Sequence, residues 1–228
     1  IFKDKNLISF LISAIKIIFL LGFLIGIHET GHFLIAKLCK VRVNEFAIGF
    51  GPVIWKKQGK ETKYELRLIP LGGFVNMEGE AEQSEKEGSF TKASIPRRIA
   101  IVAAGALVNI IFAIIVYFIL AMTVRGNITN AVVGNRVLDA DNFGNRLYFA
   151  SYNIKEFMLS IAESVKQLFT GKVSSAELVG PVGISEVVAK TNGFREFIYI
   201  LAAISISLGV TNLLPFPPLD GGKIVLIL

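Results

Sequence analysis

Three long apolar segments dominate the pattern of hydrophobic and polar positions along the chain. They run from Leu7 to Leu38, from Ile99 to Met122 and from Phe194 to Leu214, and a fourth begins at Ile224. About twenty apolar residues span the hydrocarbon core of a bilayer, so the second and third segments each suit one crossing. The pattern predicts an α-helical polytopic membrane protein with about four transmembrane helices, the fourth of them truncated.

A pattern typical of strands follows the first apolar segment. Between Lys63 and Leu68 apolar residues alternate with charged ones, which is the period of a half-buried strand. Residues 53–55 precede this strand across the polar stretch 57–60, which suits a hairpin loop. Glycines and prolines at 49–52 and 70–73 mark bends. We therefore predict a small β-hairpin or sheet on the cytoplasmic side that re-enters the membrane edge, with an ordinary soluble hairpin as the alternative.

A stripe of apolar residues at helical spacing within 154–169 predicts an amphipathic helix that lies on the membrane or on another domain.

Together, these patterns divide the chain into six parts. The parts are 1–40 (first transmembrane helix), 41–95 (hairpin region and linker), 96–123 (second transmembrane helix), 124–153 (a segment outside the cytoplasm), 154–193 (amphipathic helix and loop) and 194–228 (third helix and start of the fourth).

Composition and charge support this interpretation and add an orientation. The chain is 53% hydrophobic with a mean hydropathy of +0.59, well above an ordinary soluble domain. Twelve Lys and Arg residues lie between Lys37 and Arg98, and seven lie between Thr123 and Phe194. The excess of basic residues on the cytoplasmic side of membrane proteins places the first loop in the cytoplasm and the second outside it. Basic juxtamembrane residues near anionic lipid account for the net charge of +6, so no nucleic-acid partner is expected.

The candidate chemistry lies inside the first apolar segment. Residues 28–32 read His-Glu-Thr-Gly-His and contain the only two histidines of the chain. On a helix, His28 and His32 are one turn apart on the same face, so both imidazoles can reach one metal ion. Glu29 lies beside them and is placed to act as a base toward an attacking water. Ionisable groups in a membrane helix are costly without partners, which makes this cluster a functional site by default.

A catalytic zinc site usually has three protein ligands and an open position, and a carboxylate is a common third ligand. The candidate is Asp220, in the sequence NLLPFPPLDGG at 212–222. Three prolines and a glycine pair interrupt a helix there, and broken backbone at membrane depth is tolerated where it is buried in protein or lines a watery cavity. A surface turn is the alternative for this segment taken alone. Together with the histidine pair, it predicts Asp220 as a Zn²⁺ ligand.

Two other classes of protein remain open on these residues alone. An intramembrane metal-binding or transport protein without protease activity could use a two-histidine site, although it would need further ligands along a path. A catalytically silent membrane adaptor would not need Glu29.

Several motifs, in order along the chain, resemble the site-2 protease family of intramembrane zinc metalloproteases, in particular its bacterial RseP/RasP-like branch. They are HETGH at 28–32, FAIGFGP at 46–52, RLIPLGGFVNMEGE at 67–80, PRRIAIVAAGALVNIIFA at 96–113, LFTGKVSSAELVGPVGI at 168–184 and NLLPFPPLDGG at 212–222. The resemblance implies regulated intramembrane proteolysis in the bacterial inner membrane, with the active site near its cytoplasmic side. The substrates would be single-span proteins, such as anti-sigma factors or signal-peptide remnants, that an upstream site-1 protease has trimmed.

The resemblance also implies roles for individual residues. His28, His32 and Asp220 would bind zinc, and Glu29 would be the catalytic acid and base. Asn212 resembles a family asparagine near the active site. Asn109 resembles one on the second span that is thought to steady the substrate.

Cleavage of a transmembrane helix requires local unwinding, because its carbonyls are held in its own hydrogen bonds. An unwound segment needs new backbone partners. We expect the strand at 63–68, with Glu65, Leu66 and Arg67, to offer an edge for strand addition. Asn109 and Asn212 would hold remaining peptide groups.

The chain departs from the family pattern between its second and third spans. Members of this branch carry one or two PDZ domains there. Only about thirty residues separate Met122 from the helical pattern that starts near Ile154, which is too few for such a domain. We therefore expect that the domain is deleted or that its residues are missing from this chain.

Overall fold

A computed structural model of the chain describes residues 2–82, 84–123, 131–133, 136–139, 141–170, 187–189, 191 and 193–228. It divides into two compact units, one of Ile1–Ile110 with Leu208–Leu228 and the other of Ile111–Ser207. Most of the motif at 168–184 and part of the segment at 124–153 lie outside the described residues.

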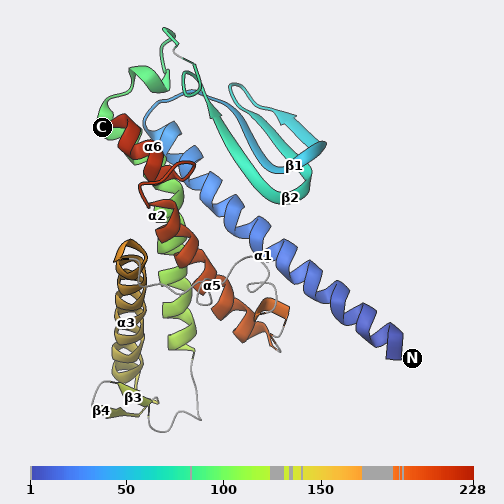
Figure 1. Ribbon diagram of the computed structural model, residues 1–228, viewed down its shortest axis with the longest axis vertical. Coiled ribbons are helices and arrows are strands. Elements are labelled where there is room, and N and C mark those ends of the chain that lie inside the picture. Colours follow the sequence, from blue (N-terminus) through green and yellow to red (C-terminus); the bar gives the residue numbers. More distant parts are fainter. Residues whose placement is uncertain are drawn as a thin grey trace. The chain divides into compact units, whose positions relative to one another are not determined.

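Within the residues that the structure describes, three helices are long and apolar enough to cross a membrane, as the apolar segments predict (Figure 1). They are α1 (Phe2–Leu38), α2 (Ile95–Met122) and α5 (Phe194–Asn212). The start of the predicted fourth helix is α6 (Asp220–Ile227), which begins four residues before Ile224. The polytopic α-helical architecture is therefore confirmed.

The first helix ends in a left-handed residue. Lys40 has a φ of 61°, and the Val41 N–H donates to the Ala36 carbonyl at 2.9 Å. A left-handed residue after the last turn lets following N–H groups reach the unpaired carbonyls at the helix end. The chain leaves α1 there and enters the sheet directly.

The predicted hairpin is present as β1 (Val43–Gln58) and β2 (Lys63–Met77), joined by a turn that the Gly59 N–H closes on the Thr62 carbonyl. The strands pair antiparallel, and both bend, so the first part of β1 has neighbours on two sides. Phe46 lies opposite Val75 and also opposite Tyr64, while Lys56 in the second part of β1 lies opposite Glu65. The sheet therefore has four adjacent segments, in the order 53–58, 63–67, 43–48 and 73–77.

The sheet lies along α1 (Figure 1). Near its bend, a Cβ on Gly22 would lie 2.7 Å from the Pro70 carbonyl oxygen, so only a glycine allows the two backbones to approach this closely. Gly22 precedes the end of α1 by sixteen residues, about 24 Å along a helix. The bent end of the sheet thus lies beside the apolar part of α1 that is a candidate membrane span. Large apolar side chains are exposed there, namely Phe50, Ile54, Trp55, Leu68 and Ile69.

One apolar core holds the first unit together. It joins the end of α1, the 43–48 and 73–77 segments of the sheet, the start of α2 and α6. A short 3₁₀ helix, η1 (Phe90–Lys92), adds Phe90 to it. The buried members are Ala36, Val41, Val43, Val75, Met77, Phe90, Ile101 and Val102, with Ile224 and Ile227 packed against them.

The second unit contains the later part of α2, the short strands β3 (Ala131–Val133) and β4 (Arg136–Leu138), the helix α3 (Phe143–Thr170) and most of α5. The predicted amphipathic helix begins at Phe143, eleven residues before the pattern placed it. The ring of Tyr117 on α2 contacts Phe157 on α3 at 5.1 Å and Tyr199 on α5 at 5.2 Å. Within this unit α2 therefore contacts both α3 and α5.

Candidate metal centre and active site

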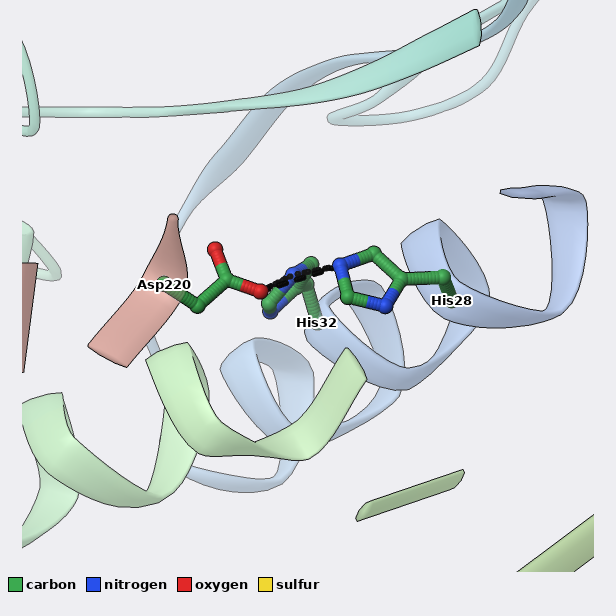
Figure 2. A group of neighbouring side chains, drawn as sticks. All are labelled: His28, His32 and Asp220. Carbon is green, nitrogen blue, oxygen red and sulfur yellow. Dashed lines mark hydrogen bonds and ion pairs between the residues drawn. The ribbon is translucent and has the colours of Figure 1, made fainter. Parts of the chain in front are cut away.

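Two histidines and an aspartate from opposite ends of the chain meet in the first unit (Figure 2). His28 Nε2 and His32 Nε2 are 3.1 Å apart, as their one-turn spacing on α1 predicts. Asp220 Oδ2 lies 3.0 Å from His28 Nε2 and 3.4 Å from His32 Nε2. Both histidines are buried, and the side chain of Asp220 is 13% exposed.

These separations fit a metal ion. Nitrogen and oxygen ligands bind zinc at about 2.0–2.1 Å, so two ligands of a tetrahedral ion lie about 3.3 Å apart. All three observed distances are close to this value. Among the described residues, no other group of three His, Cys, Asp or Glu side chains comes together in this way.

A backbone carbonyl next to His32 fixes which of its ring nitrogens carries the proton. His32 Nδ1 lies 2.8 Å from the Ile101 carbonyl oxygen, which can only accept, so Nδ1 carries the proton and donates a hydrogen bond to that oxygen. His32 Nε2 then has a free lone pair that faces His28 Nε2 and the carboxylate oxygen. Electron pairs that converge in this way repel one another unless a cation lies between them. A carbonyl that fixes the tautomer of a ligating histidine is usual at metal sites.

Gly105 on α2 makes room for the histidine pair. A Cβ at this position would lie 2.5 Å from His32 Nε2 and 2.8 Å from His28 Nε2. No side chain fits there without moving one of the imidazoles. The glycine therefore lets the backbone of α2 form one wall of the site.

Asp220 reaches the site at the start of a helix. The predicted helix break is confirmed at 213–219, between α5 and α6. The prediction that the glycine pair also breaks the helix is wrong, because Gly221 and Gly222 are buried within the first turn of α6. Asp220 is the first residue of that helix, which fixes the direction of its side chain more firmly than a free turn would.

The three residues line a pocket of about 250 Å³ together with Glu29. Glu29 follows His28 on α1, and it lines the same pocket as the histidines. The remaining lining comes from the 73–77 segment of the sheet and the turn after it, from α2 and from α6, namely Gly73, Phe74, Val75, Met77, Glu80, Val102 and Lys223. The pocket therefore holds a candidate base, a candidate metal centre and an edge of the sheet.

The two asparagines expected near the substrate do not line this pocket. Asn109 is fully buried on α2. Asn212 is half-buried as the last residue of α5. Both lie on elements beside the site, and their contact with substrate stays a prediction.

The strand residues expected to bind substrate have a different place in the structure. Glu65 has strand neighbours on both sides, Ala47 and Lys56. Its side chain is 2% exposed and pairs with Lys63 and with Arg67 at 2.8 Å. The expectation that 63–68 offers a free edge is therefore corrected, because the segment lies inside the sheet. Leu66, 39% exposed, belongs to the apolar surface near the bend.

The sequence alone does not mark Gly105, Glu80, Lys223 or the 73–77 segment as part of a site. Glu80 and Lys223 are isolated charges without a recognisable spacing. The 73–77 segment has a sequence signal in the glycines and apolar residues of GGFVNM, but only the register shows that it is an edge.

Comparisons with known proteins agree on one family. A family model described as peptidase family M50 matches residues 16–228. A protein of Fusobacterium nucleatum, provisionally named as a zinc metalloprotease, is 30% identical over 96% of this chain and 88% of its own length. A similarly named protein of Clostridium acetobutylicum is 31% identical over 91% of this chain and 84% of its own length.

Two further features of the matches concern length. The regulator of sigma-E protease RseP of Escherichia coli is 42% identical over 50% of this chain, which corresponds to 26% of its own length. The Fusobacterium match extends over 302 residues, more than the 228 residues of this chain. That relative therefore carries residues inside the matched region that this chain lacks.

Proposed function

The chain belongs to peptidase family M50, and on this premise we propose that it cleaves single-span membrane proteins in or near their transmembrane segments. It is a zinc metalloprotease and a multi-pass membrane protein. The observation that carries the proposal is the convergence of His28, His32 and Asp220 beside Glu29, with both histidines and the glutamate on a helix apolar enough to cross a bilayer.

The zinc ion would be held by His28 Nε2, His32 Nε2 and Asp220 Oδ2. Two histidines and a carboxylate are a usual ligand set for catalytic zinc, and they leave a fourth position open. When bound, zinc supplies polarisation of the scissile carbonyl and lowers the pKa of a water toward 7. The carbonyl of Ile101 keeps His32 in the tautomer that this role requires.

Glu29 would act as the acid and base of the reaction. Its carboxylate accepts a proton from the attacking water and later delivers it to the leaving amine. Phe74, Val75, Met77 and Val102 give the same pocket an apolar part of its lining.

The substrate would be held along the 73–77 segment of the sheet. This segment pairs on one side with 43–48, and no described strand pairs with its other side. Its residues Gly73, Phe74, Val75 and Met77 line the pocket. An extended peptide added to this edge receives main-chain hydrogen bonds beside Glu29 without strict sequence demands.

From the distribution of basic residues we infer on which side of the membrane the active site lies. The bias of twelve basic residues to seven puts the sheet and the metal centre near the cytoplasmic side of the membrane. In this setting the substrates would be trimmed by an upstream site-1 protease before they reach the pocket. Membrane stubs such as trimmed anti-sigma factors or signal-peptide remnants have the required single span.

Purified protein and a tagged single-span substrate in liposomes test this function. We expect the wild-type chain to cut in or beside the span, and mass spectrometry of the fragments gives the position. Glu29→Gln should cut at least about 10²-fold more slowly, the lower range for a lost acid–base group. Glu82→Gln, at an exposed position outside the pocket, should cut as the wild type does. Equal cleavage by Glu29→Gln, or cuts confined to the soluble tags, would refute the proposal.

A further inference from the structure

One ion pair lies in the pocket beside the proposed zinc ligands and base. Lys223 and Glu80 both line the pocket, and Lys223 Nζ lies 3.2 Å from Glu80 Oε1. Their side chains are 54% and 26% exposed. The pair therefore lies at the solvent side of the pocket, with the metal centre at its inner side.

The position of Lys223 follows from that of Asp220. The two residues are three apart on α6, and helix residues three apart lie on the same face. Because Asp220 faces the histidines, Lys223 faces the same pocket one turn further along. Its charge also interacts with the Glu29 carboxylate.

The proposed hydrolysis needs a donor that the ligands and the base do not supply. Attack on the scissile carbonyl places negative charge on its oxygen, and donors aimed at that oxygen are usually a large contribution to catalysis. Both histidines of the chain are committed as ligands, and Glu29 acts on the water. Among the described lining residues, the only other side chain with a hydrogen-bond donor is Lys223.

We propose that Lys223 is a catalytic residue whose ammonium donates a hydrogen bond to the carbonyl oxygen of the scissile peptide as charge develops on it. The proposal rests on the proposed function. No bond to Lys223 forms or breaks, and the lysine keeps its proton throughout. The flexible four-carbon stem and three donors of a lysine suit a group that must turn between two partners.

Glu80 holds the ammonium when no substrate is bound. Exposed ion pairs of this kind are weak, so the lysine can leave Glu80 when a carbonyl oxygen becomes the better acceptor. This gives the two residues different roles. Loss of Lys223 removes the donor, while loss of Glu80 only releases it.

The test compares Lys223→Met, Lys223→Arg and Glu80→Gln with Lys86→Met. Lys86 is a matched control because it also pairs with a glutamate, Glu78, at 3.2 Å, and it does not line the pocket. Turnover of the single-span substrate is measured together with calorimetric binding of two peptides to the zinc-loaded variants. One is a phosphinic peptide, whose oxygens mimic the charged intermediate, and the other is the cleaved product.

We expect Lys223→Met to lower kcat by about 10²-fold, as loss of one such donor does. Lys223→Met should weaken binding of the phosphinic peptide by a similar factor. It should weaken binding of the product peptide by less than about threefold, because the donor acts on the transition state. Lys223→Arg should recover part of both losses. Glu80→Gln should raise kcat by up to about fivefold, the strength of an exposed ion pair. Lys86→Met should match the wild type.

Two results would overturn the proposal. Lys223→Met and Glu80→Gln could lower kcat equally, which would make the pair a tether between the sheet and α6. Lys223→Met could instead weaken binding of both peptides equally, or leave binding of the phosphinic peptide unchanged. In each case the wild-type protein would still cleave its substrate, so failure here differs from failure of the proposed function.

Discussion

Glu65 shows how a charged residue is stabilised inside the sheet. Hydrogen bonds from Lys63 and then Arg67 favour the carboxylate and lower the pKa of Glu65 from the ordinary 4.5 to about 2. A pKa that is lower in the folded state stabilises the fold at pH values above 4.5. This stabilisation is lost as the pH falls from 4.5 toward 2.

We therefore predict that acid weakens the sheet within this pH window. The fluorescence of Trp55, the only tryptophan, can follow unfolding of the protein in detergent from pH 6 to pH 2. The wild-type protein should lose thermal stability between pH 4.5 and 2. Glu65→Gln should be less stable at neutral pH and should change less across the window, while the exposed control Glu87→Gln should follow the wild type. A Glu65→Gln profile parallel to the wild type would contradict this account.

At the scale of single residues, the sequence predicts the candidate metal ligands better than the residues that surround them. The spacing of His28 and His32 and the prolines before Asp220 are local patterns, and the structure brings all three together. Gly105 and Lys223 carry no such pattern, because their importance comes from what packs against them. Glu65 and Arg67 fit a strand equally well as edge or interior residues, so their sequence alone could not assign them to the interior.

At the scale of elements, the bends of β1 and β2 decide which edge of the sheet is open. Without the bends, two strands would form one hairpin in which both strands are edges. With them, 63–67 becomes interior and 73–77 becomes the edge beside the pocket. The sequence predicts the bends from glycines and prolines, but it cannot predict the pairing that they produce.

Disulfide trapping between the protease and its substrate tests this edge. In a Cys39→Ser and Glu29→Gln background, a cysteine at Asn76 should cross-link to cysteines placed near the substrate cut site. Asn76 is exposed on the 73–77 edge. A cysteine at Trp55, which is 53% exposed on the opposite edge, is the matched control and should cross-link at least about tenfold less. Stronger cross-linking from position 55 than from position 76 would contradict binding of the substrate at the 73–77 edge.

At the scale of the whole molecule, we predict the membrane orientation from the distribution of basic residues. The loop that contains the sheet carries twelve of them and the loop between α2 and α5 carries seven. The rule relates positive charge to the cytoplasmic side and does not depend on the fold. It therefore predicts that Gln58 and Asn142 lie on opposite sides of the membrane.

Labelling of single cysteines in intact cells checks the orientation. In a Cys39→Ser background, Asn142→Cys should react with an impermeant thiol reagent added from outside, and Gln58→Cys should react only after the membrane is permeabilised. Both positions are exposed, so a difference in labelling reports the side of the membrane. Equal labelling of both positions from outside would overturn the assignment.

The central claim is that the two ends of the chain together hold one zinc ion. The zinc content of purified Asp220→Ala, measured beside that of the wild type and Glu29→Gln, tests this claim most directly. We predict about one zinc per chain in the wild type and in Glu29→Gln, because the ligands remain. Asp220→Ala should lose most of its zinc during purification, as His28→Ala and His32→Ala should. Full zinc occupancy in Asp220→Ala would remove Asp220 from the ligand set and contradict the account.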